Sequence, residues 1–402
     1  MTRDGYTGFS RGEARTRTAS SLSFESLKFT SKLARMPWGF VLLIVAMALV
    51  GLLTLYSSAY TNPLEQNLWK LQSVRFGVTF VMMIGMALCP ISLWMRLAFP
   101  AYLGTLVLLL LVDLVGVTGG GAQRWLQIGP VAVQPSEFAK LATTLALARY
   151  YQMVLPQTSD RLFIHIGALA IIAVPAQFIF RQPDFGTTLA LIASGAVIIF
   201  LAGLMARVIV TGIIAGIAAV PAIYWFVLAP YQRERVDTFL AGLFGTATNG
   251  LGESYQIEQG KIAIGAGGWN GKGFLQGIQS QQDYVPEQHT DFILTVIAEE
   301  FGFLGSVALL TGFAILLGWS FYSALQSRSW FGRFAACGGA ATIAFYILFN
   351  VSMVIGLLPV VGMPLPLMSY GGTALLTTMA CFGIILSAYI HRDEKLIARG
   401  FL

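Results

Sequence analysis

The chain has 402 residues, of which 56% are hydrophobic and only 11% are charged. Soluble domains average about 25% charged residues, so this composition excludes a soluble globular protein and indicates a chain that crosses a membrane many times. The formal net charge is +6. In a membrane protein an excess of basic residues is explained by the orientation of the spans, because Lys and Arg concentrate in cytoplasmic loops. We therefore expect no nucleic-acid partner.

The N-terminal residues 1–36 are rich in Arg, Ser and Thr and have no sustained apolar periodicity, which predicts a disordered basic tail. A membrane domain follows over residues 37–392, and residues 393–402 form a short C-terminal tail. A span needs about 20 apolar residues. That rule predicts an all-α membrane protein with ten spans, at 38–59, 73–91, 97–116, 135–152, 163–180, 186–203, 206–228, 296–322, 333–357 and 370–390.

The basic residues predict the orientation of these spans. With the N-terminus inside, 16 of the 25 Lys and Arg fall on the cytoplasmic side, as the positive-inside rule requires. Both termini are then cytoplasmic, and a large loop at about 229–290 lies outside between the seventh and eighth spans. The other polar clusters also fall on the outer side, so we expect chemistry at the outer leaflet of the membrane.

The first polar cluster is "GAQRWLQIGPVAVQPSEFAK" at residues 121–140. Pro135 suits the first turn of a helix, where its missing N–H costs nothing. Glu137 and Lys140 are spaced i, i+3, so they share a helix face and can form an ion pair. Alternatively, Arg124 and Lys140 bind an anionic headgroup, because a guanidinium pairs well with phosphate oxygens.

Two further clusters each have a structural and a functional interpretation. Asp184, in "RQPDFGTT" at residues 181–188, is either the N-cap of the sixth span or a substrate contact. Arg233 and Arg235, in "YQRERVDTFL" at 231–240, alternate with acids and form either a solvated face or a phosphate clamp.

The stretch "SYQIEQGKIAIGAGGWNGKG" at residues 254–273 contains many glycines but no P-loop register. It predicts a short helix along the membrane surface, with Glu258 and Lys261 on one face, and then a glycine-rich turn. In "GLLPVVGMPLPLMSYGG" at 356–372, three prolines exclude a continuous helix. We expect an irregular segment that lines a groove, with Ser369 as a candidate contact.

The segment "VPEQHTDFILTVIAEE" at residues 285–300 holds four carboxylates. Thr290 or Asp291 is a natural N-cap for the eighth span. An ionised Asp291 at the helix mouth also suits a general base. Glu299 and Glu300 would lie roughly 12–14 Å further along a straight helix, deep enough to need a partner such as Lys140 or Lys261.

In chain order, these stretches resemble the motifs of the SEDS proteins (shape, elongation, division and sporulation). The resemblance covers about residues 37–392 and includes "QPSEFAK", "QPDFGTTL", "YQRERV" and "PEQHTDFILTVIAEEFGFLG". "GKGFLQGIQSQ" followed by "PEQHTDFI" is more similar to the elongation (RodA) branch than to the division (FtsW) branch. The resemblance implies a ten-helix peptidoglycan glycosyltransferase whose catalytic carboxylate is Asp291.

The resemblance also implies the reaction and the partners. Such an enzyme polymerises lipid II during cell elongation, inverts the donor carbon and releases undecaprenyl pyrophosphate, beside a class B penicillin-binding protein and the elongation machinery. Asp291 is the candidate base. A divalent cation, Mg²⁺ or Mn²⁺, could share the pyrophosphate with protein residues, although we expect no metal site made by the chain itself. The candidate substrate contacts are Arg124, Glu137, Lys140, Asp184, Arg233, Arg235, Glu258, Lys261 and Ser369.

Two alternatives remain open from the sequence. The first is a lipid II flippase, with which ten helices and charges inside the membrane are compatible. The second is a non-catalytic scaffold for a penicillin-binding protein.

Overall fold

The computed structural model describes residues 28–63, 65–119, 122–129, 131–155, 161–226, 230–243, 253–394 and 396. All ten predicted spans are confirmed as helices within these residues. They are α2 (Trp38–Ser58), α3 (Leu68–Leu88), α4 (Ile91–Val115), α5 (Pro135–Val154), α6 (Arg161–Arg181), α7 (Phe185–Leu201), α8 (Ala206–Phe226), α12 (Ile293–Gln326), α13 (Trp330–Val354) and α14 (Gly372–Ile390).

Seven of these helices, α2, α3, α4, α6, α12, α13 and α14, are long and apolar enough to cross a membrane. Of the other three, α7 has only 17 residues, and α5 carries Glu137, Lys140 and Arg149. The most apolar windows of α13 and α14 are 78% and 83% buried, against 22% in α3 and α4. Helices α13 and α14 therefore form the centre of the bundle, while α3 and α4 turn an apolar face outward.

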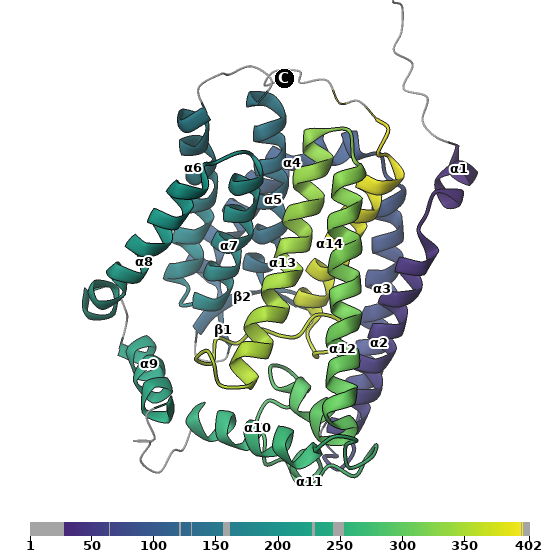
Figure 1. The fold of residues 1–402 in the computed structure, drawn as a ribbon, viewed down its shortest axis with the longest axis vertical. Helices are drawn as coiled ribbons and strands as arrows, with labels where there is room; N and C mark the ends of the chain where they lie inside the picture. The colour runs from purple at the N-terminus through teal and green to yellow at the C-terminus, as the bar shows by residue number, and fades with distance from the viewer. Residues whose placement is uncertain are drawn as a thin grey trace, which may run out of the picture.

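Both ends of the bundle carry short elements. Helix α1 (Phe29–Ala34) lies near the end of the bundle at which α14 ends, and α10 (Glu253–Gly267) and α11 (Ile278–Gln281) lie across the opposite end (Figure 1). The predicted disorder of residues 1–36 is therefore wrong for α1, whose Lys32 Nζ donates to Leu88 O at 2.7 Å. Residues 1–27 lie outside the described residues.

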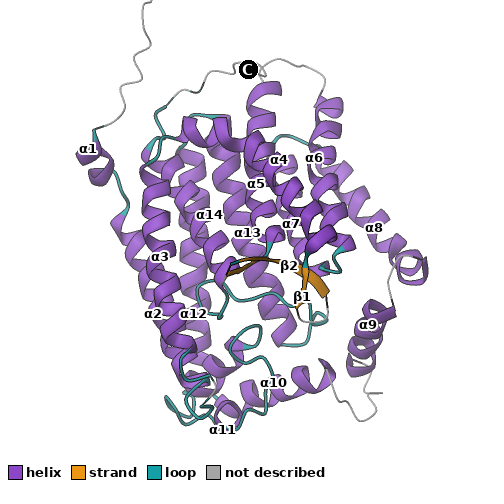
Figure 2. Ribbon diagram, turned by 180° about the vertical axis from the view of Figure 1, so that it is seen from behind, coloured by secondary structure: helices purple, strands orange, loops and turns teal. Residues whose placement is uncertain are grey.

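The segments that were predicted to lie on the outer side contain regular elements. Strands β1 (Val117–Gly119), β2 (Ala122–Ile128) and β3 (Val131–Val133) form a small antiparallel sheet between α4 and α5 (Figure 2). The described part of the predicted loop at 229–290 contains α9 (Pro230–Leu243), α10 and α11. The short helix predicted within residues 254–273 is confirmed as α10, followed by turns with Gly268, Gly271 and Gly273 at positive φ.

Helix α12 is broken at Gly302, where φ is 67° and ψ is −162°. The backbone N–H groups of Lys272 and Gly273 donate to the carbonyls of Glu299 and Glu300, at 3.0 and 2.9 Å. Beyond the break, the N–H of Phe303 donates to Gly268 O at 2.9 Å. The glycine-rich turn thus satisfies the backbone groups that a break inside a membrane protein would otherwise leave unpaired. Helix α12 covers the span predicted at 296–322, and the break within it was not predicted from the sequence.

Candidate active site

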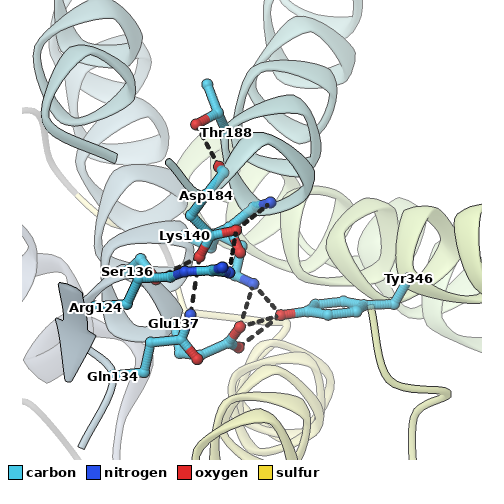
Figure 3. Close-up of polar contacts among 9 residues, drawn as sticks. Arg124, Gln134, Ser136, Glu137, Lys140, Asp184, Thr188 and Tyr346 are labelled. Carbon is cyan, nitrogen blue, oxygen red and sulfur yellow. Dashed lines mark hydrogen bonds and ion pairs between the residues drawn. The ribbon is translucent and has the colours of Figure 1, made fainter. Parts of the chain in front are cut away.

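Asp184 is the centre of a polar network in which residues of β2, α5 and the start of α7 meet (Figure 3). It caps α7, since its Oδ1 accepts from the Thr187 N–H at 3.2 Å, which confirms the predicted N-cap. Its Oδ2 accepts from Gln134 Nε2 at 2.9 Å and from the Ser136 hydroxyl at 3.4 Å. Arg124 Nη1 lies 3.9 Å from Oδ1, so the short sheet brings a guanidinium to the helix cap.

Glu137 and Lys140 form a second buried group beside the first. The ion pair predicted from their i, i+3 spacing is confirmed, with Lys140 Nζ 2.7 Å from Glu137 Oε1. The Tyr346 hydroxyl on α13 accepts from Lys140 and lies 2.6 and 2.7 Å from the two Glu137 oxygens. Lys140 is 0% and Glu137 4% exposed, so a charge pair with a hydroxyl, fully removed from water, joins α5 to α13.

Asp291 lies two residues before α12 begins. The predicted N-cap at Thr290 or Asp291 is wrong, because the N-cap position falls on Phe292, and the Thr290 hydroxyl instead donates back to Glu287 Oε2 at 2.7 Å. The side chain of Asp291 is half-buried. A Cβ added at Gly362 would lie 3.6 Å from Asp291 Oδ2, so the carboxylate faces the irregular segment at 356–371.

Asn350 fixes Asp291 against that segment. Its Nδ2 donates to the backbone carbonyls of Asp291 and Met363, at 2.7 Å each. Asn350 and Tyr346 are four residues apart on α13, so they share a helix face. One face of α13 therefore contacts both the backbone of Asp291 and the Glu137–Lys140 pair. Met363 packs against Tyr346 on this face.

Ser369 has a structural role in the described residues. Its hydroxyl accepts from the Leu365 N–H at 2.7 Å, and its carbonyl accepts from Gln72 Nε2 at 3.1 Å. A small pocket lies beside it, lined by Tyr346, Ser369, Thr378 and residues of the proline-rich segment. The expectation that this segment is irregular is confirmed over residues 356–371, and the Ser369 hydroxyl is used to fold it.

The remaining candidate contacts are not brought to Asp291. Arg233 lies on α9, where its Nη2 donates to Trp225 O at 2.8 Å, and α9 stands apart from the bundle (Figure 1). The side chain of Arg235 lies outside the described residues. Glu258 and Lys261 are both exposed on α10, and no ion pair between them is recorded. The Lys261 ammonium instead lies against Gly356, where an added Cβ would be 2.6 Å from Nζ.

Glu299 and Glu300 have partners other than those expected. Lys272 Nζ binds Glu299 Oε1 at 2.9 Å, and the N–H groups of Gln279 and Ser280 donate to the same carboxylate. Glu300 accepts from the Ser57 hydroxyl at the end of α2 and from the Leu275 N–H. The proposed partners Lys140 and Lys261 are therefore wrong. Because α12 breaks just after these acids, the turn at 267–281 folds over them and supplies the donors.

Three residues of this region were not singled out from the sequence, namely Tyr346, Asn350 and Arg75. Tyr346 and Asn350 sit in an apolar span, where a polar residue inside a membrane is itself a signal of function. Arg75 is a charged residue in the apolar helix α3. In all three cases a polar or charged side chain inside a hydrophobic run was the available signal.

In the described residues no group of three or more His, Cys, Asp or Glu side chains could hold a metal ion. A divalent cation at this site would need most of its ligands from a bound substrate.

Comparisons with known proteins agree with this architecture. The peptidoglycan glycosyltransferase MrdB of Escherichia coli K12 is 40% identical over 324 residues, which are 80% of this chain and 85% of that protein. A chain of a peptidoglycan synthase complex that couples polymerization to crosslinking has a TM-score of 0.75 at 32% identity, covering 89% of this chain and 98% of that one. Rod shape determining protein RodA of Thermus thermophilus has a TM-score of 0.67 at 28% identity, covering 90% and 98% of the two chains. The family model described as a cell cycle protein, for FtsW, RodA and SpoVE, matches residues 35–394, and the chain therefore belongs to this family, the SEDS proteins.

Proposed function

We infer that this protein is a peptidoglycan glycosyltransferase of the cell-elongation type. The relatives with this activity cover most of the chain, and the structural neighbours include a rod shape determining protein. The observation that carries a catalytic assignment is the placement of Asp291. It is a half-buried carboxylate whose backbone is held by Asn350 and whose side chain faces the irregular segment.

The reaction that fits this carboxylate is the polymerisation of lipid II. The 4-hydroxyl of one GlcNAc attacks C1 of a second MurNAc, the C1–oxygen bond to pyrophosphate breaks, and the electron pair leaves with undecaprenyl pyrophosphate. Asp291 accepts the proton from the attacking hydroxyl as general base. One displacement inverts the α-linked donor to a β-1,4 product, so a second catalytic carboxylate is not needed.

The departing pyrophosphate requires positive charge. Among the predicted contacts, Arg124 is the best placed, since it is partly exposed and only loosely paired with Asp184. Lys140 is fully enclosed by Glu137 and Tyr346, which supports a role in holding α5 and α13 together. A divalent ion carried by the substrate phosphates is compatible with this proposal.

The proposal extends to topology and partners. We place the end that bears α10, α11 and the small sheet on the extracytoplasmic side of the bacterial inner membrane, with both termini in the cytoplasm. The distribution of Lys and Arg supports this orientation. We also propose a class B penicillin-binding protein and the elongation machinery as partners, because a structural neighbour is part of a complex that couples polymerization to crosslinking.

The test is polymerisation of purified lipid II by the protein with its transpeptidase partner, comparing the wild type with Asp291→Asn. Asn is nearly isosteric with Asp but cannot accept the proton, so we expect a folded, partner-binding protein without glycan product. Asp283→Asn is the matched control, because Asp283 lies in the same outer segment at φ 53°, a conformation that Asn tolerates. Glycan formation by Asp291→Asn would disprove the base assignment. Lipid translocation without glycan by the wild type would favour a flippase.

A further inference from the structure

Arg75 is a charged residue within a membrane-spanning helix that has no acidic partner among the described residues. It lies on α3, and its guanidinium stacks on the Tyr370 ring with Cζ 4.6 Å from the ring centroid. No ion pair and no side-chain hydrogen bond of Arg75 is recorded in the part of the chain that the structure describes. A guanidinium has five N–H donors, and a charge at membrane depth is a functional residue by default.

Three other basic residues of this region already have acidic partners. Lys140 is bound to Glu137, Arg124 faces Asp184, and Lys272 is bound to Glu299. Each of these charges is at least partly neutralised by a carboxylate of the protein. The charge of Arg75 is not, so it remains available to an incoming anion.

Arg75 is also connected to the region of Asp291. The N–H of Tyr370, on which Arg75 stacks, donates to His289 O at 2.8 Å, two residues before Asp291. Helix α3 packs along α14, which begins at Gly372 (Figure 2). A Cβ added at Gly372 would lie 3.6 Å from Arg75 Nε, so the glycine lets the guanidinium approach the start of α14. The guanidinium thus lies against Tyr370, whose backbone is hydrogen-bonded to the segment that leads into the proposed base.

A second unsatisfied group lies one turn away on the same face of α3. Gln72 is only 3% exposed, and its Nε2 donates to Ser369 O at 3.1 Å. Its Oε1 is buried without a hydrogen-bond partner in the described residues. A buried acceptor without a donor destabilises the folded protein, so a ligand that donates an N–H or O–H group to Gln72 Oε1 would stabilise this site. Arg75 and Gln72 together suit a phosphate joined to a group with hydrogen-bond donors.

We propose that Arg75 and Gln72 form a phosphate subsite of the glycosyltransferase, which binds the pyrophosphate of a prenyl-linked sugar between α3, Tyr370 and the start of α14. The pyrophosphate oxygens accept from the Arg75 guanidinium, and Gln72 Oε1 accepts from the attached sugar. The inference rests on the proposed function, because that function supplies the prenyl pyrophosphate. It adds a binding residue to that function and does not alter the role of Asp291.

The test measures binding without turnover, so that its outcome is independent of catalysis. Undecaprenyl pyrophosphate is titrated into the full chain in phosphatidylcholine nanodiscs, for the wild type, Arg75→Gln, Arg75→Lys and Lys70→Gln, each also in the Asp291→Asn background. We expect Arg75→Gln to weaken binding about tenfold and Arg75→Lys to weaken it less, because Lys keeps the charge but loses the planar fork. Lys70→Gln is the control, since Lys70 is an exposed residue of the same helix that binds Asn67. It should bind like the wild type.

The outcomes separate three explanations. Equal affinity of the wild type and both Arg75 variants overturns the subsite. An affinity difference that vanishes when phosphatidylglycerol is added to the nanodiscs also overturns it, because Arg75 would then bind the headgroups of bulk lipids. Loss of folding in Arg75→Gln leaves Arg75→Lys as the deciding variant, and its unchanged affinity would count against the proposal. Lipid II polymerisation by Asp291→Asn would disprove the assignment of Asp291 as the base. It would not change the conclusion drawn from the affinities of the Arg75 variants.

Discussion

Asn350 ties the backbone of Asp291 to the irregular segment at 356–371, with Nδ2 2.7 Å from both Asp291 O and Met363 O. The side chain is fully buried on α13, the helix that also carries Tyr346. The amide of a neighbouring helix therefore helps to hold the proposed base in position. The pair of contacts explains how an aspartate outside any regular element can be held in place.

Replacing Asn350 by Leu should lower the polymerisation rate by at least about tenfold, because Asp291 loses the contact that orients its backbone. The two carbonyls left without donors should also lower the free energy of unfolding by about 1–3 kcal/mol. Lipid II polymerisation and thermal denaturation in detergent measure the two effects. Thr342→Val is the control, since the Thr342 hydroxyl bonds only to Gly338 O in its own helix. A wild-type rate in Asn350→Leu would exclude the positioning role.

The Glu137–Lys140 pair should behave as a coupled buried unit. Lys140→Met leaves the Glu137 carboxylate buried without its cation, which should cost about 3–5 kcal/mol in the free energy of unfolding. Adding Glu137→Leu removes the unpaired charge and should restore most of that loss. A double-mutant cycle by thermal denaturation in detergent measures the coupling. Additive losses from the two substitutions would contradict a direct pair.

Gly302→Ala should destabilise the protein by about 1–3 kcal/mol, because φ there is 67° and side chains rarely adopt that conformation. An added Cβ would also lie 2.7 Å from Trp269 O in the turn that closes over the break. Gly318→Ala, in the same helix with nothing within 4 Å of its Cβ, should be neutral or slightly stabilising. Melting temperatures of the two variants in detergent compare them directly. Equal values would mean that the break tolerates a side chain.

His391, just beyond α14, should make stability depend on pH. Burial lowers the pKa of its imidazole below the ordinary value, and nearby Lys32 and Arg35 act in the same direction. The unfolded chain therefore binds a proton more readily than the folded one, so stability is retained above about pH 6.5 and falls as the pH drops below it. The melting temperature of the wild type should fall more steeply between pH 7.5 and pH 5 than that of His391→Gln. Parallel profiles would show that His391 does not contribute.

Much of the architecture follows from local properties of the chain. Apolar runs of about 20 residues predict the ten helices, since each span must satisfy its own backbone hydrogen bonds in lipid. The N-cap at Asp184, the start of α5 at Pro135 and the Glu137–Lys140 pair follow from residues at most three or four positions apart. The glycine-rich turns after α10 and the irregular proline-rich segment are likewise local backbone properties.

Contacts between distant parts of the chain were decided only by the tertiary structure. The sequence placed Glu299 near Lys140 or Lys261, whereas packing of the turn after α10 gave it Lys272. The same packing breaks α12 at Gly302. Hydropathy alone does not predict this break, because the residues on both sides of it are apolar. Tyr346, Asn350 and Arg75 acquire their importance from partners on other helices. Hydropathy and spacing report each helix separately, while the pairing of charges depends on which helix faces meet.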